Sequence, residues 1–153
     1  WRHIQAAVKD GTDREARWQM MMCSTEGALA FVKGLGAVHA MSHAAGRIER
    51  LNLHHGTLNA VFLPAVLRFN APECGDKYER LLQAMGLAPG ADIAEAITAM
   101  NADIGLPSGL AAMGVEEDDI PELIAYAQKD LAALSNPRRA SADDFEMMVR
   151  QSL

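Results

Sequence analysis

Cysteine is scarce in this chain, with two among 153 residues, Cys23 and Cys74. The two lie far apart and form neither a Cys-x-x-Cys motif nor a disulfide framework, so we interpret each as a small buried side chain. A chain without structural disulfides suits a reducing compartment. We therefore expect a cytoplasmic protein.

The sequence also lacks a basic cluster and a long apolar run. The formal net charge is -6, and the 14 Lys and Arg residues are scattered along the chain. This distribution argues against nucleic acid and anionic membranes as partners. The longest stretch without Asp, Glu, Lys or Arg, residues 51–67, contains Asn, His and Pro and is too polar to span a membrane. We expect a small-molecule partner instead.

Signals for β-structure are absent as well. No run of β-branched residues occurs, nothing alternates between apolar and polar, and Ala, Leu and Met recur at helical spacing. A length of 153 residues suits one domain with a buried core. The predicted fold is therefore all-α, a multi-helix bundle. The residues from Trp1 resemble the end of a helix already under way, and no initiator Met or signal peptide precedes them, so we expect a longer polypeptide with residues upstream.

Capping and breaking residues predict where the helices lie. The pattern Thr12-Asp-Arg-Glu15 is a capping box that predicts a long helix through residue 31, ending at Lys33-Gly34. The next helix should carry His39 and His43 and end near Gly46. A polar loop is predicted over residues 47–54. Further helices are predicted over 56–70 with a kink or break at Pro64, and over 76–85, 92–103, 120–134 and 142–151, with Pro121 in a first turn and Ser141 as an N-cap. Segments 28–36 and 58–67 are predicted to form the core.

Histidine is concentrated in one region: four of the five histidines lie within residues 39–55. His39 and His43 are four residues apart, which places them on one face of a helix, and His54 and His55 are adjacent before Gly56. Imidazole is the commonest protein ligand for a transition metal. The cluster predicts a metal site, and the alternative is a set of hydrogen-bonded core histidines.

Two motifs in this region resemble a known family. The run Gly34-Leu-Gly-Ala-Val-His-Ala-Met-Ser-His-Ala-Ala-Gly46 and the run from His54-His-Gly to Arg-Phe-Asn70 are similar to the signature of the iron-containing (group III) alcohol dehydrogenases. Weaker matches extend the resemblance to nearly the whole chain, at residues 13–31, 104–107, 119–121 and 136–138.

The resemblance implies a division of the protein into two domains. Residues 1–153 would be the C-terminal, metal-binding helical domain of a dehydroquinate synthase-like fold. An N-terminal, Rossmann-like nucleotide-binding domain, absent from this chain, would face it across the active-site cleft. Members of the family are commonly dimers or larger, so the resemblance also implies a homo-oligomer.

The resemblance further implies a role for each histidine. The family's metal is Fe²⁺ or, in some members, Zn²⁺, held by one aspartate and three histidines. Two of these ligands match His39 and His55, whereas the other two belong to an upstream helix that His3 does not resemble. The residue that corresponds to His43 faces the nicotinamide and the substrate, which makes His43 the candidate for proton relay.

The loop before His55 departs from the family pattern. It is two residues longer than usual, and His54 stands where many members carry proline. Because adjacent histidines point in different directions, they are not expected to share one metal. His54 in place of His55 is the alternative ligand.

The function implied is interconversion of an alcohol with an aldehyde or ketone by hydride transfer with NAD or NADP, and this segment alone should be inactive. Two other interpretations are open. One is a non-catalytic helical binding or assembly module with structural histidines, and the other is a metal-dependent hydrolase or lyase with Glu49 as general base. The substrate, the nucleotide, the metal and the oligomeric state are not determined by the sequence.

Several other motifs have structural interpretations. The methionines at 20–22 beside Trp18 should fill gaps in the core. The acidic run at 116–119 should stabilise the start of the following helix. The glycines at 34 and 36 should allow close packing, and Asn59 and Asn70 should cap or hydrogen-bond within the fold.

Overall fold

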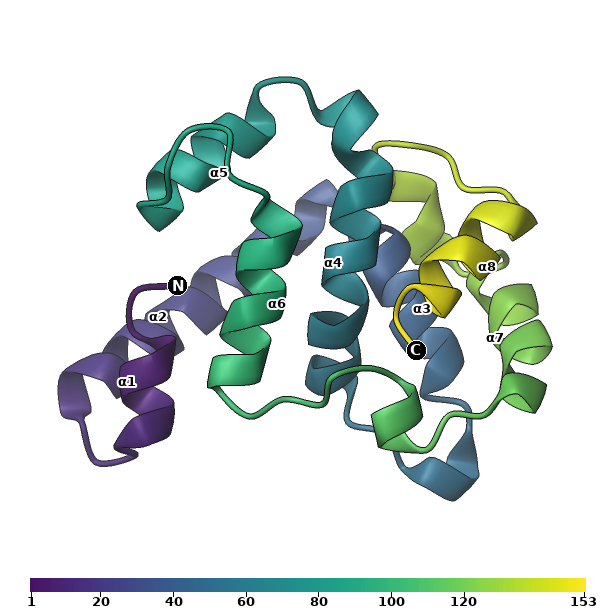
Figure 1. The fold of residues 1–153 in the computed structure, drawn as a ribbon, viewed down its shortest axis with the longest axis horizontal. Helices are drawn as coiled ribbons and strands as arrows, with labels where there is room; N and C mark the ends of the chain where they lie inside the picture. The colour runs from purple at the N-terminus through teal and green to yellow at the C-terminus, as the bar shows by residue number, and fades with distance from the viewer.

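The computed structural model describes residues 1–153 and contains α-helices and short 3-10 helices with no strand, so the all-α prediction is confirmed (Figure 1). None of the helices combines the length and the apolar character that a membrane span requires. The α-helices are α1 (Ile4–Lys9), α2 (Arg14–Leu29), α3 (Gly36–Ala45), α4 (His55–Cys74), α5 (Lys77–Met85), α6 (Ile93–Asp103), α7 (Ile120–Ala127) and α8 (Ala142–Arg150). The 3-10 helices are η1 (Ala30–Lys33), η2 (Glu49–Leu51), η3 (Ala111–Met113), η4 (Glu117–Asp119) and η5 (Leu131–Ser135).

The core lies between α3, α4, α7 and α8, with α6 packed along α4 (Figure 1). Met41 of α3, Phe62 of α4, Leu123 of α7 and Phe145 of α8 are buried in one continuous cluster. The apolar positions of these helices recur at helical spacing, so each helix turns one stripe toward the others. The prediction that residues 58–67 contribute to the core is confirmed, since this segment holds five of the buried side chains, Leu58, Val61, Phe62, Ala65 and Val66.

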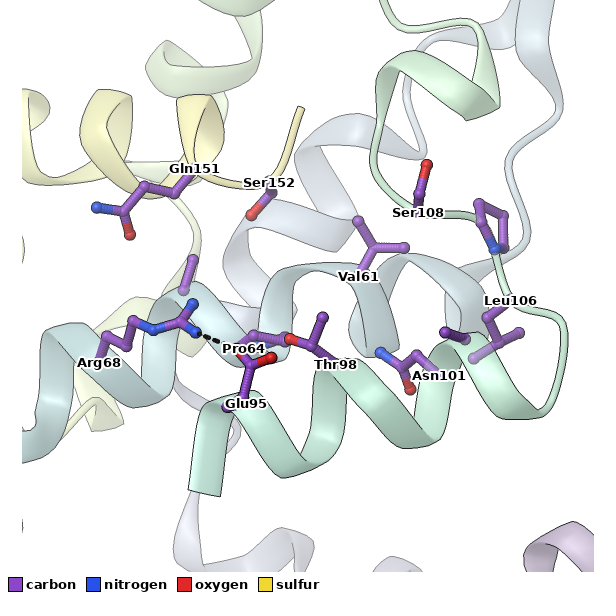
Figure 2. A pocket seen from close by; sticks show the side chains of 13 residues that line it. Val61, Pro64, Arg68, Glu95, Thr98, Asn101, Leu106, Ser108, Gln151 and Ser152 are labelled. Atoms are coloured by element: carbon purple, nitrogen blue, oxygen red, sulfur yellow. Dashed lines mark ion pairs between the residues drawn. The ribbon is translucent and has the colours of Figure 1, made fainter. Parts of the chain in front are cut away.

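Helix α4 is longer than predicted and passes through Pro64 without a break. Proline has no backbone N–H, so the carbonyl of Ala60, four residues earlier, loses its helical donor. The side-chain amide of Asn101 on α6 donates to that carbonyl at 2.9 Å, and Figure 2 shows Asn101 beside α4. This bond from a distant helix replaces the missing one at Pro64. The predicted end at residue 70 is wrong, since the helix reaches Cys74.

The α1–α2 hairpin lies at one end of the molecule, away from α7 and α8 (Figure 1). Helix α1 begins at Ile4, and the N-cap of α2 is Asp13 rather than the predicted Thr12. The Asp13 carboxylate accepts the Ala16 N–H, whereas the Thr12 hydroxyl donates to Asp10.

Most of the apolar side chains of α2 and η1 are exposed. Segment 28–36 was predicted to be core, yet Leu29, Phe31 and Val32 are exposed because α2 packs mainly on α1 and η1. The core prediction for the methionine run is wrong for the same reason, since Trp18, Met21 and Met22 face solvent. Cys23 is exposed, contrary to expectation, and Cys74 is buried as predicted.

The predicted helix over 120–134 is divided in two. Helix α7 starts with Pro121 in its first turn and ends at Ala127. The backbone of Asp130 is extended, and its side chain accepts the Ala132 N–H to begin η5. The other predicted helices match α5, α6 and α8 to within about one residue, with Ser141 capping α8 as expected.

Candidate metal centre

Helix α3 and the first residue of α4 bring three imidazole rings together. The ring centroids lie 5.2 Å apart for His39 and His55, 5.3 Å for His43 and His55, and 5.7 Å for His39 and His43. His39 and His43 share one face of α3, as their spacing predicted, while α4 packs directly against α3. The structure thus gathers His39, His43 and His55, the three residues to which the sequence assigned a site role.

The position of α3 is determined by its core face and by its N-terminus. Ala37, Ala40 and Met41 are fully buried on the core side. At the N-terminus, the Ser135 hydroxyl accepts the Leu35 and Gly36 N–H groups, which holds η5 against the start of the helix. A Cβ on Gly34 would overlap the Ser135 side chain, so the predicted role of this glycine in close packing is confirmed.

His55 has a polar neighbour at each ring nitrogen. Its Nδ1 lies 3.2 Å from the Ser42 hydroxyl, and its Nε2 lies 3.1 Å from the Asn59 amide nitrogen. The Ser42 hydroxyl in turn donates to the His39 carbonyl at 3.2 Å. The carbonyl oxygen of Asn59 is buried and has no hydrogen-bond partner. Asn59 was predicted to cap or hydrogen-bond within the fold, and its contact with His55 is such a hydrogen bond.

His43 contacts a carboxylate that the sequence interpretation missed. Its Nδ1 lies 2.9 Å from Asp130 Oδ2, while the other Asp130 oxygen caps η5. The sequence pattern placed Asp130 inside a helix, where it would not face α3. An aspartate suited to an N-cap was the one available signal.

The electrostatics of the cluster lower the pKa of two of the rings. Burial lowers the pKa of the His39 imidazole below its usual range, and the nearby His55 and His43 lower it further. Burial also lowers the pKa of His55, with smaller contributions from His43 and His54. Because neutral imidazole is the form that binds metals, the lowered pKa values favour His39 and His55 as nitrogen donors to a divalent metal.

The donor set within this chain is nevertheless incomplete. No three His, Cys, Asp or Glu side chains are placed so that together they could hold a metal ion. The donor chemistry of the histidines fits part of a coordination shell and does not complete one.

The other predicted histidines lie apart from the three rings. The His54 side chain accepts the Thr57 N–H and caps α4, a role that uses its Nδ1 in helix formation. His3 precedes α1 and makes no capping bond. Glu49, the candidate base of the hydrolase interpretation, is exposed in η2.

The acidic run acts at a helix start, as predicted. Asp119 accepts the Glu116 N–H in a capping box that precedes α7, and it also pairs with Arg50. A separate cavity of about 280 Å³ between α4 and α6 is lined by Arg68 and Glu95, which form an ion pair, and by residues near the C-terminus (Figure 2). No histidine lines that cavity.

Comparison with known proteins places these features in context. The chain is 51% identical to a 4-hydroxybutyrate dehydrogenase of Cupriavidus necator, over all of the chain and 42% of that protein. It is 34% identical to an NAD-dependent methanol dehydrogenase of Bacillus methanolicus, over 99% of the chain and 42% of that protein. A solved 1,3-propanediol oxidoreductase superposes with a TM-score of 0.92 at 35% identity, covering 99% of this chain and 42% of that one.

The chain therefore spans about two fifths of the length of the relatives it matches. The pattern described as "Fe-containing alcohol dehydrogenase family, C-terminal" matches residues 1–153 in full. The match covers the two histidine motifs and the rest of the chain, and the fold agrees with it. On this evidence the chain belongs to the Fe-containing alcohol dehydrogenase family.

Proposed function

We propose that residues 1–153 are the C-terminal, metal-binding domain of a dehydrogenase that interconverts an alcohol with an aldehyde or ketone, using NAD or NADP. The observation that carries the proposal is the convergence of His39, His43 and His55 from two helices, in a chain of this family. Family membership favours the dehydrogenase over a non-catalytic module and over a hydrolase or lyase.

In this proposal His39 and His55 hold a divalent metal, Fe²⁺ or alternatively Zn²⁺. Their ring centroids are 5.2 Å apart, and burial lowers the pKa of both imidazoles. The remaining ligands belong to a segment outside this chain. A bound divalent metal acts as a Lewis acid that draws electron density from a substrate oxygen.

His43 is proposed to move a proton during the reaction. Its hydrogen bond to Asp130 favours the tautomer with the proton on Nδ1, which leaves Nε2 able to accept another. In alcohol oxidation the carbon gives a hydride to the nicotinamide and the hydroxyl gives up a proton, which His43 would accept. In the reverse direction the same nitrogen would return the proton to the carbonyl oxygen.

The wider setting of this domain is also a proposal. An N-terminal nucleotide-binding domain would supply the other metal ligands and hold the nicotinamide near His43, and the protein would act as a homo-oligomer in the cytoplasm. The relatives' names refer to 4-hydroxybutyrate, methanol and 1,3-propanediol. Because these share a primary hydroxyl on a short carbon chain, we infer a short primary alcohol as the substrate class.

The test uses the complete protein with both domains. His39→Ala and His55→Ala should each lose bound metal and at least about 99% of turnover, measured by metal analysis and by nucleotide absorbance with short alcohols. His43→Ala should keep its metal and lose turnover by roughly 100-fold, because it removes a proton acceptor and no ligand. His3→Ala is the matched control, and its metal content and turnover should equal those of the wild type. Unchanged turnover in both His39→Ala and His55→Ala would exclude the proposed function.

A further inference from the structure

Ser42 is a polar side chain buried within the histidine cluster. It lies on α3 between His39 and His43 and is 1% exposed. Burying a hydroxyl is costly unless its hydrogen-bonding capacity is used. Its oxygen has two partners, the His39 carbonyl and Nδ1 of His55, each at 3.2 Å.

The two contacts determine which groups donate. A serine hydroxyl has one hydrogen, and the geometry directs it to the His39 carbonyl, which can only accept. Ser42 Oγ must then accept from His55, which places the ring proton on Nδ1. The Asn59 amide nitrogen, also a donor, faces Nε2 on the opposite side of the ring. Both contacts are satisfied by the same tautomer, with the proton on Nδ1 and the lone pair on Nε2.

We propose that Ser42 is a positioning residue for His55, with a hydroxyl that fixes the ring orientation and presents Nε2 as the metal-binding nitrogen. This inference rests on the proposed function in one respect, the assignment of His55 as a ligand. A metal-bound histidine commonly donates its second ring N–H to a neighbouring acceptor, which orients the ring and increases its basicity. Here the acceptor comes from the helix that carries the other proposed ligand, so one hydroxyl couples His55 to the backbone of His39.

Asn59, unlike Ser42, opposes metal binding by His55. Its amide occupies Nε2, the nitrogen that the proposal assigns to the metal, so it must turn away when the metal binds. Its buried carbonyl oxygen has no partner in the present arrangement, so little holds the amide in place. Removing Asn59 is therefore expected to leave metal affinity unchanged or to increase it.

Ser152 provides a matched control for the purely structural role of a buried helical serine. It is 5% exposed, and its hydroxyl donates to the Met148 carbonyl at 2.8 Å. It has no imidazole partner. Ser42→Ala and Ser152→Ala each remove one buried hydroxyl bonded to a helix carbonyl, and only the first removes an acceptor from His55.

The experiment measures the Zn²⁺ dissociation constant of the complete protein by competition with a chromogenic chelator. Ser42→Ala should raise the constant roughly 10-fold, within the range usual for lost outer-shell partners. Ser152→Ala should leave it within about twofold, and Asn59→Ala should lower it or leave it unchanged. Ser42→Thr should restore tight binding because it keeps the hydroxyl, and Ser42→Cys, a weak acceptor of nearly the same size, should fall between wild type and Ser42→Ala.

Three outcomes would contradict the role of Ser42. The Zn²⁺ dissociation constant of Ser42→Ala could stay within about twofold of wild type, or Ser42→Ala and Ser152→Ala could weaken Zn²⁺ binding equally. The third outcome is a Ser42→Cys variant that binds Zn²⁺ as tightly as wild type. The Co²⁺ absorption spectrum gives a second readout, and it should change in Ser42→Ala but not in Ser152→Ala if His55 is reoriented. A wild-type protein that binds neither Fe²⁺ nor Zn²⁺ would reject the proposed function itself, whereas tight wild-type binding with an unaffected Ser42→Ala would reject this inference alone.

Discussion

Helices α2 and α3 are both rich in apolar residues but differ sharply in burial. Helix α3 buries six of its ten residues, whereas α2 buries one of sixteen, Ala16. The difference comes from their neighbours: α3 is covered by α4, α7 and η5, and α2 packs mainly on α1 and η1. Apolar composition therefore does not determine burial, which depends on what the rest of the chain places against each helix.

The histidine cluster lies where these two regions meet. The Phe31 ring of η1, which is exposed, approaches His39 edge-on at a centroid distance of 6.0 Å. The opposite side of α3 is packed into the core through Met41. His39 and His43 are thus carried by a helix that packs into the core, while one side of the cluster is bordered by exposed apolar surface.

The difference in burial between α3 and α2 is tested most directly with two methionines, one on each helix. Met41 on α3 is 0% exposed and Met21 on α2 is 57% exposed. Met41→Ala should lower the free energy of unfolding by about 2–5 kcal/mol, because it leaves a cavity in the core. Met21→Ala should change it by less than about 0.5 kcal/mol. Urea unfolding followed by circular dichroism measures both, and equal effects would show that the two helices are equally covered.

The next largest change in stability is expected at Pro64 inside α4. Asn101→Ala would leave the Ala60 carbonyl without a donor, so the free energy of unfolding should fall by about 1–3 kcal/mol. Replacing the exposed Gln83 by alanine is the control and should have little effect. Pro64→Ala should weaken the dependence on Asn101, since an alanine N–H can bond to the same carbonyl. An Asn101→Ala variant as stable as wild type would mean that α4 tolerates Pro64 without help from α6.

A smaller effect is expected at the start of α2. Asp13→Ala should destabilise the first turn of that helix by about 1 kcal/mol, because Asp13 accepts the Ala16 N–H. Thr12→Ala should cost less than half as much, since the Thr12 hydroxyl bonds to Asp10 outside the helix. Hydrogen exchange of the α2 amides reports this local change. If Thr12→Ala destabilised the first turn of α2 more than Asp13→Ala, Thr12 would be the N-cap instead.

The smallest effect is a pH dependence at the start of α8. Hydrogen bonds from the backbone N–H and the hydroxyl of Ser141 hold the pKa of Asp144 below its usual range. The folded carboxyl then binds protons less readily than the unfolded one, so its contribution to stability is present above a pH of about 4 and is lost as the pH falls further. Asp144→Asn should reduce the loss of stability between about pH 4 and pH 3, measured by thermal unfolding.

The neighbouring Asp143 supplies the control for that measurement. Its carboxylate makes no hydrogen bond to Ser141, so Asp143→Asn should keep the acid sensitivity of the wild type. Identical acid profiles for wild type and Asp144→Asn would contradict the assigned cap.

Local signals predicted most helices but misplaced some of their ends. Thr12 and Asp13 are both good N-cap residues, and the choice between them depended on the bond between Thr12 and Asp10. A proline in a helical pattern ordinarily predicts a break, and the pattern gave no sign that Asn101, far along the chain, would donate to the carbonyl left free at Pro64. The extended backbone of Asp130 is likewise invisible to periodicity, because the flanking residues continue a helical pattern.

The sequence by itself determined the all-α class, the common face of His39 and His43, and the family, because each of these depends on the identity and spacing of nearby residues. The contact between His55 and Asn59 likewise joins residues four apart within α4 and follows from helical spacing. Only the tertiary structure decided, by contrast, that Asp130 contacts His43 and that Ser42 contacts His55. The first of these bonds joins residues 87 positions apart, and both join groups whose proximity depends on how helices pack. Such contacts are not encoded in the periodicity of any one segment, since they exist only once α3, α4 and η5 have been brought together by the burial of a shared core.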